Sequence, residues 1–143
     1  NHFKVICPIT DPYVVHHGAL GSYVCVHIEG STAHQDVAKF LKDLPGITEV
    51  YLREEASQRL ELPADRIGDI VALSGRDVVL GRRPEDHDLS HVANGLRSHG
   101  GRYEEMVPFI VSGRLQPEYA ARAAGDLRNF DIFDFVCNGI ADE

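Results

Sequence analysis

The sequence lacks the features that mark membrane, secreted and nucleic-acid-binding proteins. No apolar run approaches the roughly 20 residues that a helix needs to cross a bilayer. The 14 basic residues are outnumbered by 22 acidic ones, and a net charge of -8 would repel nucleic-acid phosphates. The three cysteines lie far apart, with no C-x-x-C pair and no secretion signal. This pattern predicts reduced, mostly buried thiols and a cytoplasmic location, without a nucleic-acid or membrane partner.

Several catalytic and phosphate-binding motifs are also missing. The chain has no G-x-S-x-G nucleophile elbow and no G-x-x-x-x-G-K-[ST] or G-x-G-x-x-G phosphate loop. It has no internal repeat, low-complexity tract or long linker of proline, glycine and serine. These absences argue against a serine hydrolase and against a nucleotide-binding loop.

The residues that are present describe an ordinary globular domain. A chain of 143 residues, 43% hydrophobic and 25% charged, is long enough for one domain with a core. Apolar periodicity predicts alternating strands and helices, and therefore an α/β or α+β class with a mainly mixed sheet. The predicted strands cover residues 4–9, 23–28, 47–52, 68–73, 78–80 and 107–111, and the predicted helices about 32–44, 54–60, 117–124 and 131–138.

Local signals set the expected ends of these elements. Thr32 and Gln35 have the spacing of a capping box at the start of the first helix. Residues 74–77 (SGRD) predict a hairpin turn between two apolar segments. Asn129 and Gly139 are expected to cap the two ends of the last helix. Residues 28–80 then form a small β-α-β unit with an added hairpin.

A polar loop over residues 82–101 holds the densest set of potential metal ligands. It contains His87 and His91 and then His99 within RSHGG at 97–101. A zinc-like ion takes imidazole nitrogens and carboxylate oxygens, and glycines beside a ligand let the backbone approach it closely. The spacing alone leaves two interpretations open for His99, a metal ligand or a solvated loop histidine. For His87 and His91, a solvated loop histidine is the default interpretation.

A second histidine-rich segment covers residues 10–22 (TDPYVVHHGALGS). His16 and His17 are adjacent and would point to opposite faces of an extended segment, so both cannot easily bind one ion. The alternative is a glycine-rich turn with a structural bend at Asp11. His27 and His34 are most simply structural or exposed.

Three segments together resemble the phosphonoacetate hydrolase family. They are PITDPYVVHHGALGS at 8–22, LRSHGGRYEEMVPFI at 96–110 and LRNFDIFD at 127–134. That family belongs to the alkaline phosphatase superfamily, near its nucleotide pyrophosphatase/phosphodiesterase branch. The resemblance runs from about residue 5 to residue 140. His-Gly-Gly followed by Glu and Val-Pro is shared across the branch, while the first and third segments point to the particular family.

The resemblance implies a zinc-dependent hydrolase that splits a small-molecule phosphonate, phosphonoacetate, into acetate and phosphate. In such enzymes a threonine attacks phosphorus, and two zinc ions hold the attacking and departing groups. The histidine of His-Gly-Gly is a metal ligand in the family, and that role carries over to His99. The implied fold is the C-terminal part of an alkaline phosphatase-like α/β domain with a small α+β insertion of β-α-β-β type.

The chain departs from the family pattern by lacking most of the expected site. The nucleophilic threonine, the substrate-holding lysines and an Asp-His-Gly-Met ligand pair lie upstream in the family, and nothing here matches them. Thr10 and Thr32 do not sit in the nucleophile's context. We therefore expect residues 1–143 to be a C-terminal segment that is inactive alone. It would contain no catalytic residue and no assigned substrate-binding residue. Residues 23–81 would form the insertion or cap.

Two other functions stay open at this stage. One keeps the superfamily and changes the substrate to a phosphodiester or a phosphomonoester. The other makes the chain a stand-alone α+β ligand-binding or interaction module. The sequence assigns no role to Asp11, His16, His17, His87 or His91, and a homodimer is left open.

Overall fold

The computed structural model describes residues 2–7, 21–81 and 99–141. The chain divides into two compact units, Asn1–Glu105 and Met106–Glu143, which we describe separately. Within the described ranges, no helix is both long enough and apolar enough to cross a membrane.

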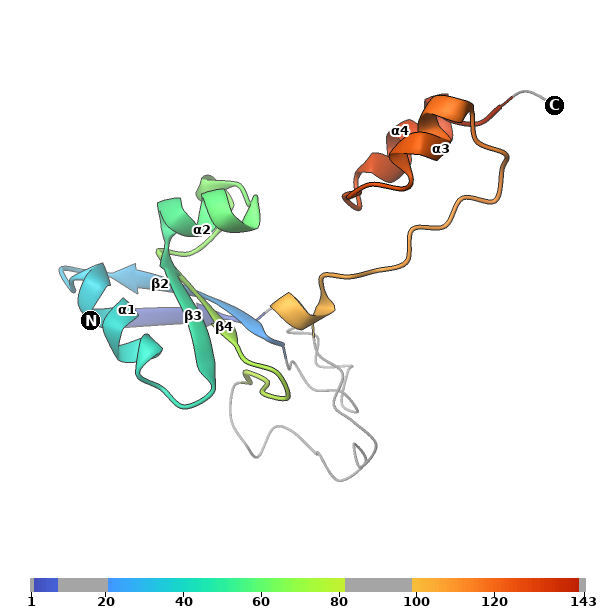
Figure 1. The fold of residues 1–143 in the computed structure, drawn as a ribbon. Coiled ribbons are helices and arrows are strands. Elements are labelled where there is room, and N and C mark those ends of the chain that lie inside the picture. The colour runs from blue at the N-terminus through green and yellow to red at the C-terminus, as the bar shows by residue number, and fades with distance from the viewer. Residues whose placement is uncertain (1, 8–20, 82–98, 142–143) are drawn as a thin grey trace, which may run out of the picture. The chain divides into compact units, whose positions relative to one another are not determined.

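The first unit is built on a four-stranded sheet in the order β1-β2-β4-β3 (Figure 1). Its strands are β1 (His2–Ile6), β2 (Tyr23–Glu29), β3 (Ile47–Leu52) and β4 (Ile70–Ser74). All three neighbouring pairs are antiparallel. The α/β mixture is as predicted, but the predicted mixed sheet is wrong. Residues 30–46 join β2 to β3, which run in the same direction, and β4 inserts between them, so each neighbouring pair is antiparallel.

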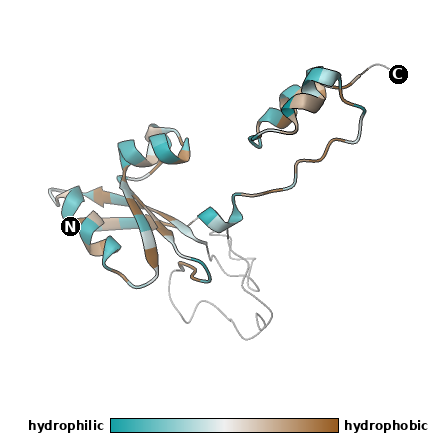
Figure 2. Ribbon diagram, in the orientation of Figure 1, coloured by the Kyte–Doolittle hydropathy of each residue, from teal (hydrophilic) through white to brown (hydrophobic). Residues whose placement is uncertain are grey.

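Helices cover the two faces of this sheet. Helix α1 (His34–Lys42) lies against β3 and β4. Helix α2 (Arg53–Leu60) is followed by the 3-10 turn η1 (Ala64–Arg66). Side chains alternate along a strand, so one face of the sheet packs under α2 and the other turns away from it. The α2 side holds the main core, made of Cys25, Ala56, Ile67, Val71 and Leu73. Figure 2 shows the hydrophobic strands beside the hydrophilic surface of α2.

Helix α1 buries less of its apolar face than its sequence predicts. None of its residues is fully buried, and Phe40 is 63% exposed. Together with Phe3 and Val5 of β1, this face lines an apolar groove of about 350 Å³. Helix α1 covers β3 and β4, and the β1 side of the same sheet face stays open.

The predicted capping box at the start of α1 is wrong. The helix begins at His34, and Ala33 occupies the N-cap position without a side-chain hydrogen bond. The hydroxyl of Thr32 is buried and has no hydrogen-bond partner among the described residues. The start lies one residue later than the capping-box spacing requires, so Thr32 is not at the position from which it could cap.

The hairpin predicted around residues 74–77 is also wrong, although its turn exists. Val78 N–H donates to the carbonyl of Gly75 at 3.2 Å, and Asp77 adopts a positive φ of 61°. Strand β4 pairs with β2 and β3, and Leu80 instead forms a bridge with Gly21. Both edges of β4 are already occupied, so the second arm of the turn pairs elsewhere. Residues 23–81 therefore have the order β-α-β-α-β, in place of β-α-β-β. Strand β1, from outside this range, joins their sheet.

Asp69 fastens β2 to the start of α2. Its carboxylate accepts the backbone N–H of Ile28 at 2.8 Å and pairs with the guanidinium of Arg53. The Arg53 N–H also donates to the Asp69 carbonyl at 3.0 Å. The hydrogen bond from Ile28, with help from Arg53, lowers the pKa of Asp69 below its usual value of 3.8. Asp69 thus stabilises the fold as a carboxylate.

Replacing Asp69 by asparagine is expected to lower the free energy of unfolding by about 1–3 kcal/mol at pH 7. A depressed folded pKa means that this contribution is complete above pH 3.8 and is lost as the pH falls through the folded value. Chemical denaturation at pH 7 and near pH 3 should therefore show a smaller gap between wild type and variant at low pH. Asp65→Asn, at an exposed position in η1, is the control. An equal loss in both variants at pH 7 would contradict this role of Asp69.

The second unit is a pair of short helices around one buried ring. Helix α3 (Pro117–Arg122) begins with proline at its first position as predicted, and α4 (Asp131–Asn138) has the predicted bounds. Phe135 is fully buried, with the rings of Phe109 and Tyr119 edge-on at 5.1 and 5.2 Å. Aromatic edge-to-face contacts of this kind hold the small unit together.

Three sequence expectations fail in this unit. No strand forms over residues 107–111, because the backbone there has no ladder partner among the described residues. Phe130, not Asn129, is the N-cap of α4, and the Arg128 N–H is instead accepted by the Asp131 carboxylate at 2.7 Å. Cys137 is exposed, whereas Cys25 is buried as predicted.

Candidate functional site

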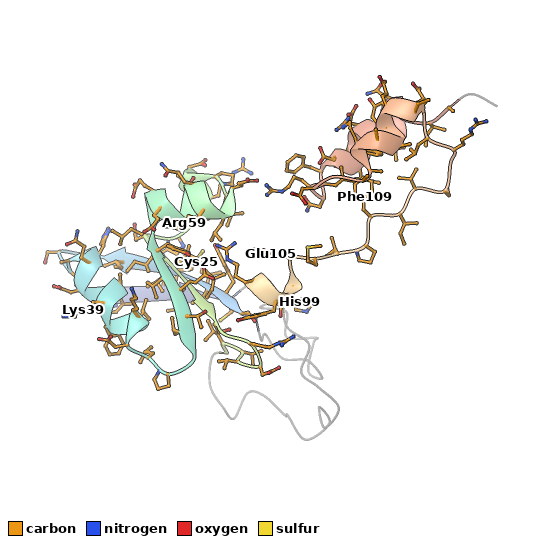
Figure 3. All side chains as sticks on the ribbon, viewed as in Figure 1. Cys25, Lys39, Arg59, His99, Glu105 and Phe109 are labelled. Carbon is orange, nitrogen blue, oxygen red and sulfur yellow. The ribbon has the colours of Figure 1, made fainter. Side chains whose placement is uncertain are left out.

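His99 is described by the structure at the start of a short segment that packs against the sheet. His99 is exposed, and its backbone carbonyl accepts the N–H of Ser22 at 2.8 Å. Ser22 is 3% exposed, and its own carbonyl accepts the N–H of Ser74 on β4 at 3.0 Å. The main chain of His99 is thus fixed to the sheet, while its imidazole remains on the surface (Figure 3).

The two glycines after His99 each have a local reason. Gly100 has a positive φ of 77°, a conformation that side-chain-bearing residues rarely adopt. Gly101 is buried, and a Cβ placed on it would lie 2.4 Å from the Cβ of Ser22. The His-Gly-Gly sequence therefore lets this backbone turn sharply and then lie directly on Ser22.

Glu104 closes the turn that follows. The 3-10 turn η3 (Arg102–Glu104) starts after Gly101, whose N–H donates to a carboxylate oxygen of Glu104 at 2.8 Å. The Glu104 N–H returns a hydrogen bond to the Gly101 carbonyl at 3.2 Å. This reciprocal pair satisfies backbone groups at the start of the turn and stiffens the residues next to His99.

Arg102 connects the same segment to strand β3. Its Nε lies 3.2 Å from both carboxylate oxygens of Glu49, and a terminal nitrogen lies 3.2 Å from one of them. The other terminal nitrogen donates to Glu105 at 2.7 Å, and Tyr51 donates its hydroxyl proton to Glu49 at 2.5 Å. The guanidinium is shared by two carboxylates, one of which is on the sheet.

The charges in this cluster stabilise one another. The hydrogen bond to Glu105, joined by contacts with Tyr51 and Glu49, raises the pKa of Arg102 above its already high ordinary value. The hydrogen bond to Glu49 raises the pKa of Tyr51, because ionised tyrosine would face a carboxylate. Arg102 is therefore charged and Tyr51 neutral at physiological pH.

A small polar cavity adjoins the His99 segment. It has a volume of about 190 Å³, and its lining includes Ser22, Tyr103 and Glu104 from the packed region and Arg76 and Asp77 from the turn after β4. The guanidinium of Arg76 lies over the ring of Tyr103, 5.8 Å from its centroid. Both signs of charge line this cavity, so its electrostatics do not select one class of ligand.

The other histidines predicted from the sequence are not brought to this site by the described structure. His27 is on β2 and His34 begins α1. Asp11, His16, His17, His87 and His91 lie outside the described residues. Within residues 2–7, 21–81 and 99–141, no three His, Cys, Asp or Glu side chains gather as a metal site would require. His99 could supply a single ligand to a zinc ion, since the residue is exposed and its backbone is held by Ser22.

Sequence reasoning missed the residues that support His99. Ser22 lies 77 positions before His99, and Glu49 lies 53 positions before Arg102. Neither distance corresponds to a helical or strand period, so no local pattern could have paired them. The one sequence signal was the glycine at position 101 itself, since a glycine next to a candidate ligand can mark a close approach of another backbone.

Comparison with known proteins supports the resemblance given by the sequence. No family model matches the chain. Two structures of phosphonoacetate hydrolase from Sinorhizobium meliloti 1021, in complex with phosphonoformate and with phosphonoacetate, are 47% identical to it with a TM-score of 0.75. Each match covers 97% of this chain and 33% of the structure's chain.

The resemblance to a portion of phosphonoacetate hydrolase is thereby confirmed. The chain spans about a third of the length of the structures that it matches. At this level of identity, the match extends to the sequence as well as the fold, which distinguishes it from a likeness of architecture alone.

Proposed function

We propose that the intact protein containing this chain is a phosphonoacetate hydrolase of the alkaline phosphatase superfamily, with His99 as one ligand of a zinc site. The observation that carries this proposal is 47% identity over 97% of the chain to an enzyme of that activity. The reaction would consume water and release acetate and phosphate from phosphonoacetate. The related enzyme was captured with phosphonoacetate and with phosphonoformate, two ligands that carry a carboxylate close to a phosphonate.

The arrangement around His99 supports the metal assignment. Three features hold its backbone in place: the Ser22 N–H, the close packing of Gly101 and the turn closed by Glu104. A metal ligand on a prearranged backbone loses little conformational freedom when the ion binds. When bound, zinc would act as a Lewis acid on a phosphoryl oxygen and lower the pKa of a coordinated hydroxyl or water. The part played by this chain is to present the imidazole.

A substrate comparison tests the proposal. In the intact protein, kcat/KM for phosphonoacetate should exceed that for methylphosphonate, a phosphodiester and a phosphomonoester by at least about 100-fold. A site built to bind a substrate carboxylate rejects analogues that lack it by large factors. Released acetate and inorganic phosphate should appear in equal amounts. Faster cleavage of the phosphodiester or the phosphomonoester would refute the phosphonate proposal and favour another activity of the superfamily.

A further inference from the structure

The ion pair between Glu49 and Arg102 joins the sheet to the segment that begins with His99. Glu49 lies on β3, at the edge of the sheet opposite β1. Arg102 lies one residue after Gly101 and three after His99. Both side chains are half-buried, at 24% and 31% exposed. Tyr51, two positions along the same strand, donates a hydrogen bond to the Glu49 carboxylate from the same side of the sheet.

This pair supplies an anchor that the backbone contacts do not. The N–H of Ser22, the residue before β2, holds the carbonyl of His99, and Gly101 packs on the Ser22 side chain. Between these two contacts lies Gly100, and a glycine leaves the backbone freer to rotate than other residues do. The Arg102 guanidinium adds a contact to Glu49 on β3, and β4 lies between β2 and β3 in the sheet. The segment is thus tied at both ends, to two strands that are not neighbours.

The geometry of the pair is suited to fixing a position. Arg102 directs two nitrogens at the carboxylate of Glu49, with three contacts at 3.2 Å. A planar guanidinium that meets a carboxylate in this way restricts orientation as well as distance. The hydroxyl of Tyr51 donates to one of the carboxylate oxygens that Arg102 also contacts. Glu105 takes the remaining side of the guanidinium.

We propose that Glu49 and Arg102 are positioning residues that hold the His99 segment in the place from which its imidazole binds metal. Neither residue would itself be a ligand, and both would act through the backbone between Gly101 and His99. The inferred role in metal binding rests on the proposed function, whereas the inferred anchoring of the His99 segment does not. The small α+β sheet would then set the geometry of the site, in addition to its packing role.

The first test measures the segment itself. In the intact protein, Glu49→Ala should speed amide hydrogen exchange in peptides spanning residues 99–105 by about tenfold, because a hydrogen-bonded charge is lost. Glu49→Gln keeps the size of the side chain and should give a smaller increase, which covers the case in which Glu49→Ala fails to fold. The matched control is Glu55→Ala, which breaks an exposed ion pair to Arg59 on α2. Exchange over 99–105 should be unchanged in the control.

The second test measures metal affinity apart from activity. Glu49→Ala and Arg102→Ala should each weaken zinc binding about 10- to 100-fold, the range found when residues that orient a metal ligand are removed. The double variant should lose no more than Arg102→Ala alone, because both single changes remove the contact between these two side chains. Arg102→Lys keeps the charge but not the paired geometry, so its affinity should lie between wild type and Arg102→Ala. Lost turnover in these variants should recover at saturating zinc.

The outcomes separate this proposal from the proposed function. Unchanged exchange over residues 99–105 in Glu49→Ala, Glu49→Gln and Arg102→Ala would overturn the anchoring of the segment. Faster exchange with wild-type zinc affinity would overturn its role in metal binding. If the wild-type protein binds no zinc, the proposed function fails and the metal statement fails with it, while exchange still decides whether the pair anchors the segment.

Discussion

Replacing His99 by alanine in the intact protein should lower zinc affinity and turnover by more than about 100-fold, beyond the loss expected for a residue that only orients a ligand. The imidazole is exposed on a fixed backbone, so its removal deletes a donor without disturbing a core. Zinc content after dialysis against a graded metal buffer gives the affinity. Phosphate release from phosphonoacetate gives the rate.

The fold of the variant should survive, which makes the result interpretable. The Ser22 N–H donates to the backbone carbonyl of His99, so this hydrogen bond at 2.8 Å persists after truncation to alanine. The metal-free forms of wild type and His99→Ala should therefore unfold at the same temperature. Their melting temperatures should separate only when zinc is added, since a ligand that binds the folded state stabilises it.

A second histidine provides the control for this experiment. His34 is exposed at the first position of α1, and His34→Ala removes another exposed imidazole from the same unit. Its zinc content and turnover should match wild type. Equal zinc binding by wild type and His99→Ala would overturn the assignment of His99 as a ligand. An equal loss in His34→Ala would indicate a general effect of removing histidines.

Most secondary structure elements in the first unit could be predicted because each has a local signal. Residues rich in β-branched and aromatic side chains predict β2, and alternating apolar residues predict β3. In the second unit, Gly139 indicates the end of α4. The resemblance of three segments also predicted the family to which the chain is similar. These are properties of neighbouring residues, and tertiary contacts did not override them.

The pairing of the strands could not be predicted in the same way. Strand β4 lies between two apolar strands, β2 and β3, in the sheet. Nothing in its own sequence distinguishes the turn at residues 74–77 from a hairpin. The bridge between Gly21 and Leu80 depends on β2 and β3 already occupying β4. A continuous apolar sequence predicts a buried strand, but it does not predict which strands pair with it.

Residues 107–111 show a different error, because their apolar side chains predict a strand that does not form. The run includes Pro108, which lacks a backbone donor, and it contributes Phe109 to the ring cluster around Phe135. A single side chain of the run is thus used for packing while its backbone makes no ladder. The apolar composition of the run is consistent with the packing of Phe109, but the strand that it predicted is wrong.

The support of the candidate site was the least predictable part. His99 and its two glycines could be recognised as a local motif, whereas Ser22 lies just before β2 and Glu49 and Tyr51 come from β3, all far away in the sequence. Their roles arise from the order β1-β2-β4-β3, which places the start of β2 and the strand β3 on either side of β4. A motif in one sequence therefore identified the candidate ligand but not what holds it.

Gly101→Ala should disrupt the candidate site nearly as strongly as the loss of His99. Its φ is -95°, which any residue can adopt, so backbone strain gives no reason for a glycine here. The reason is space, since the new Cβ would lie 2.4 Å from Ser22 Cβ and 2.5 Å from a Glu104 oxygen. The Glu104 side chain can move away. Ser22 cannot, because it is buried and its backbone is bonded to His99 on one side and Ser74 on the other.

The segment carrying His99 must then lift from the sheet, with a loss of about 1–3 kcal/mol in the free energy of unfolding, as for an overpacked core position. Zinc affinity should fall with it. Gly125→Ala is the control, since the nearest heavy atom to its new Cβ would be the Arg122 carbonyl oxygen at 3.4 Å, and it should behave as wild type. Ser22→Gly combined with Gly101→Ala removes the obstructing Cβ and should recover part of the zinc affinity. If that double variant binds zinc no better than Gly101→Ala alone, contact with Ser22 is not what keeps residue 101 a glycine.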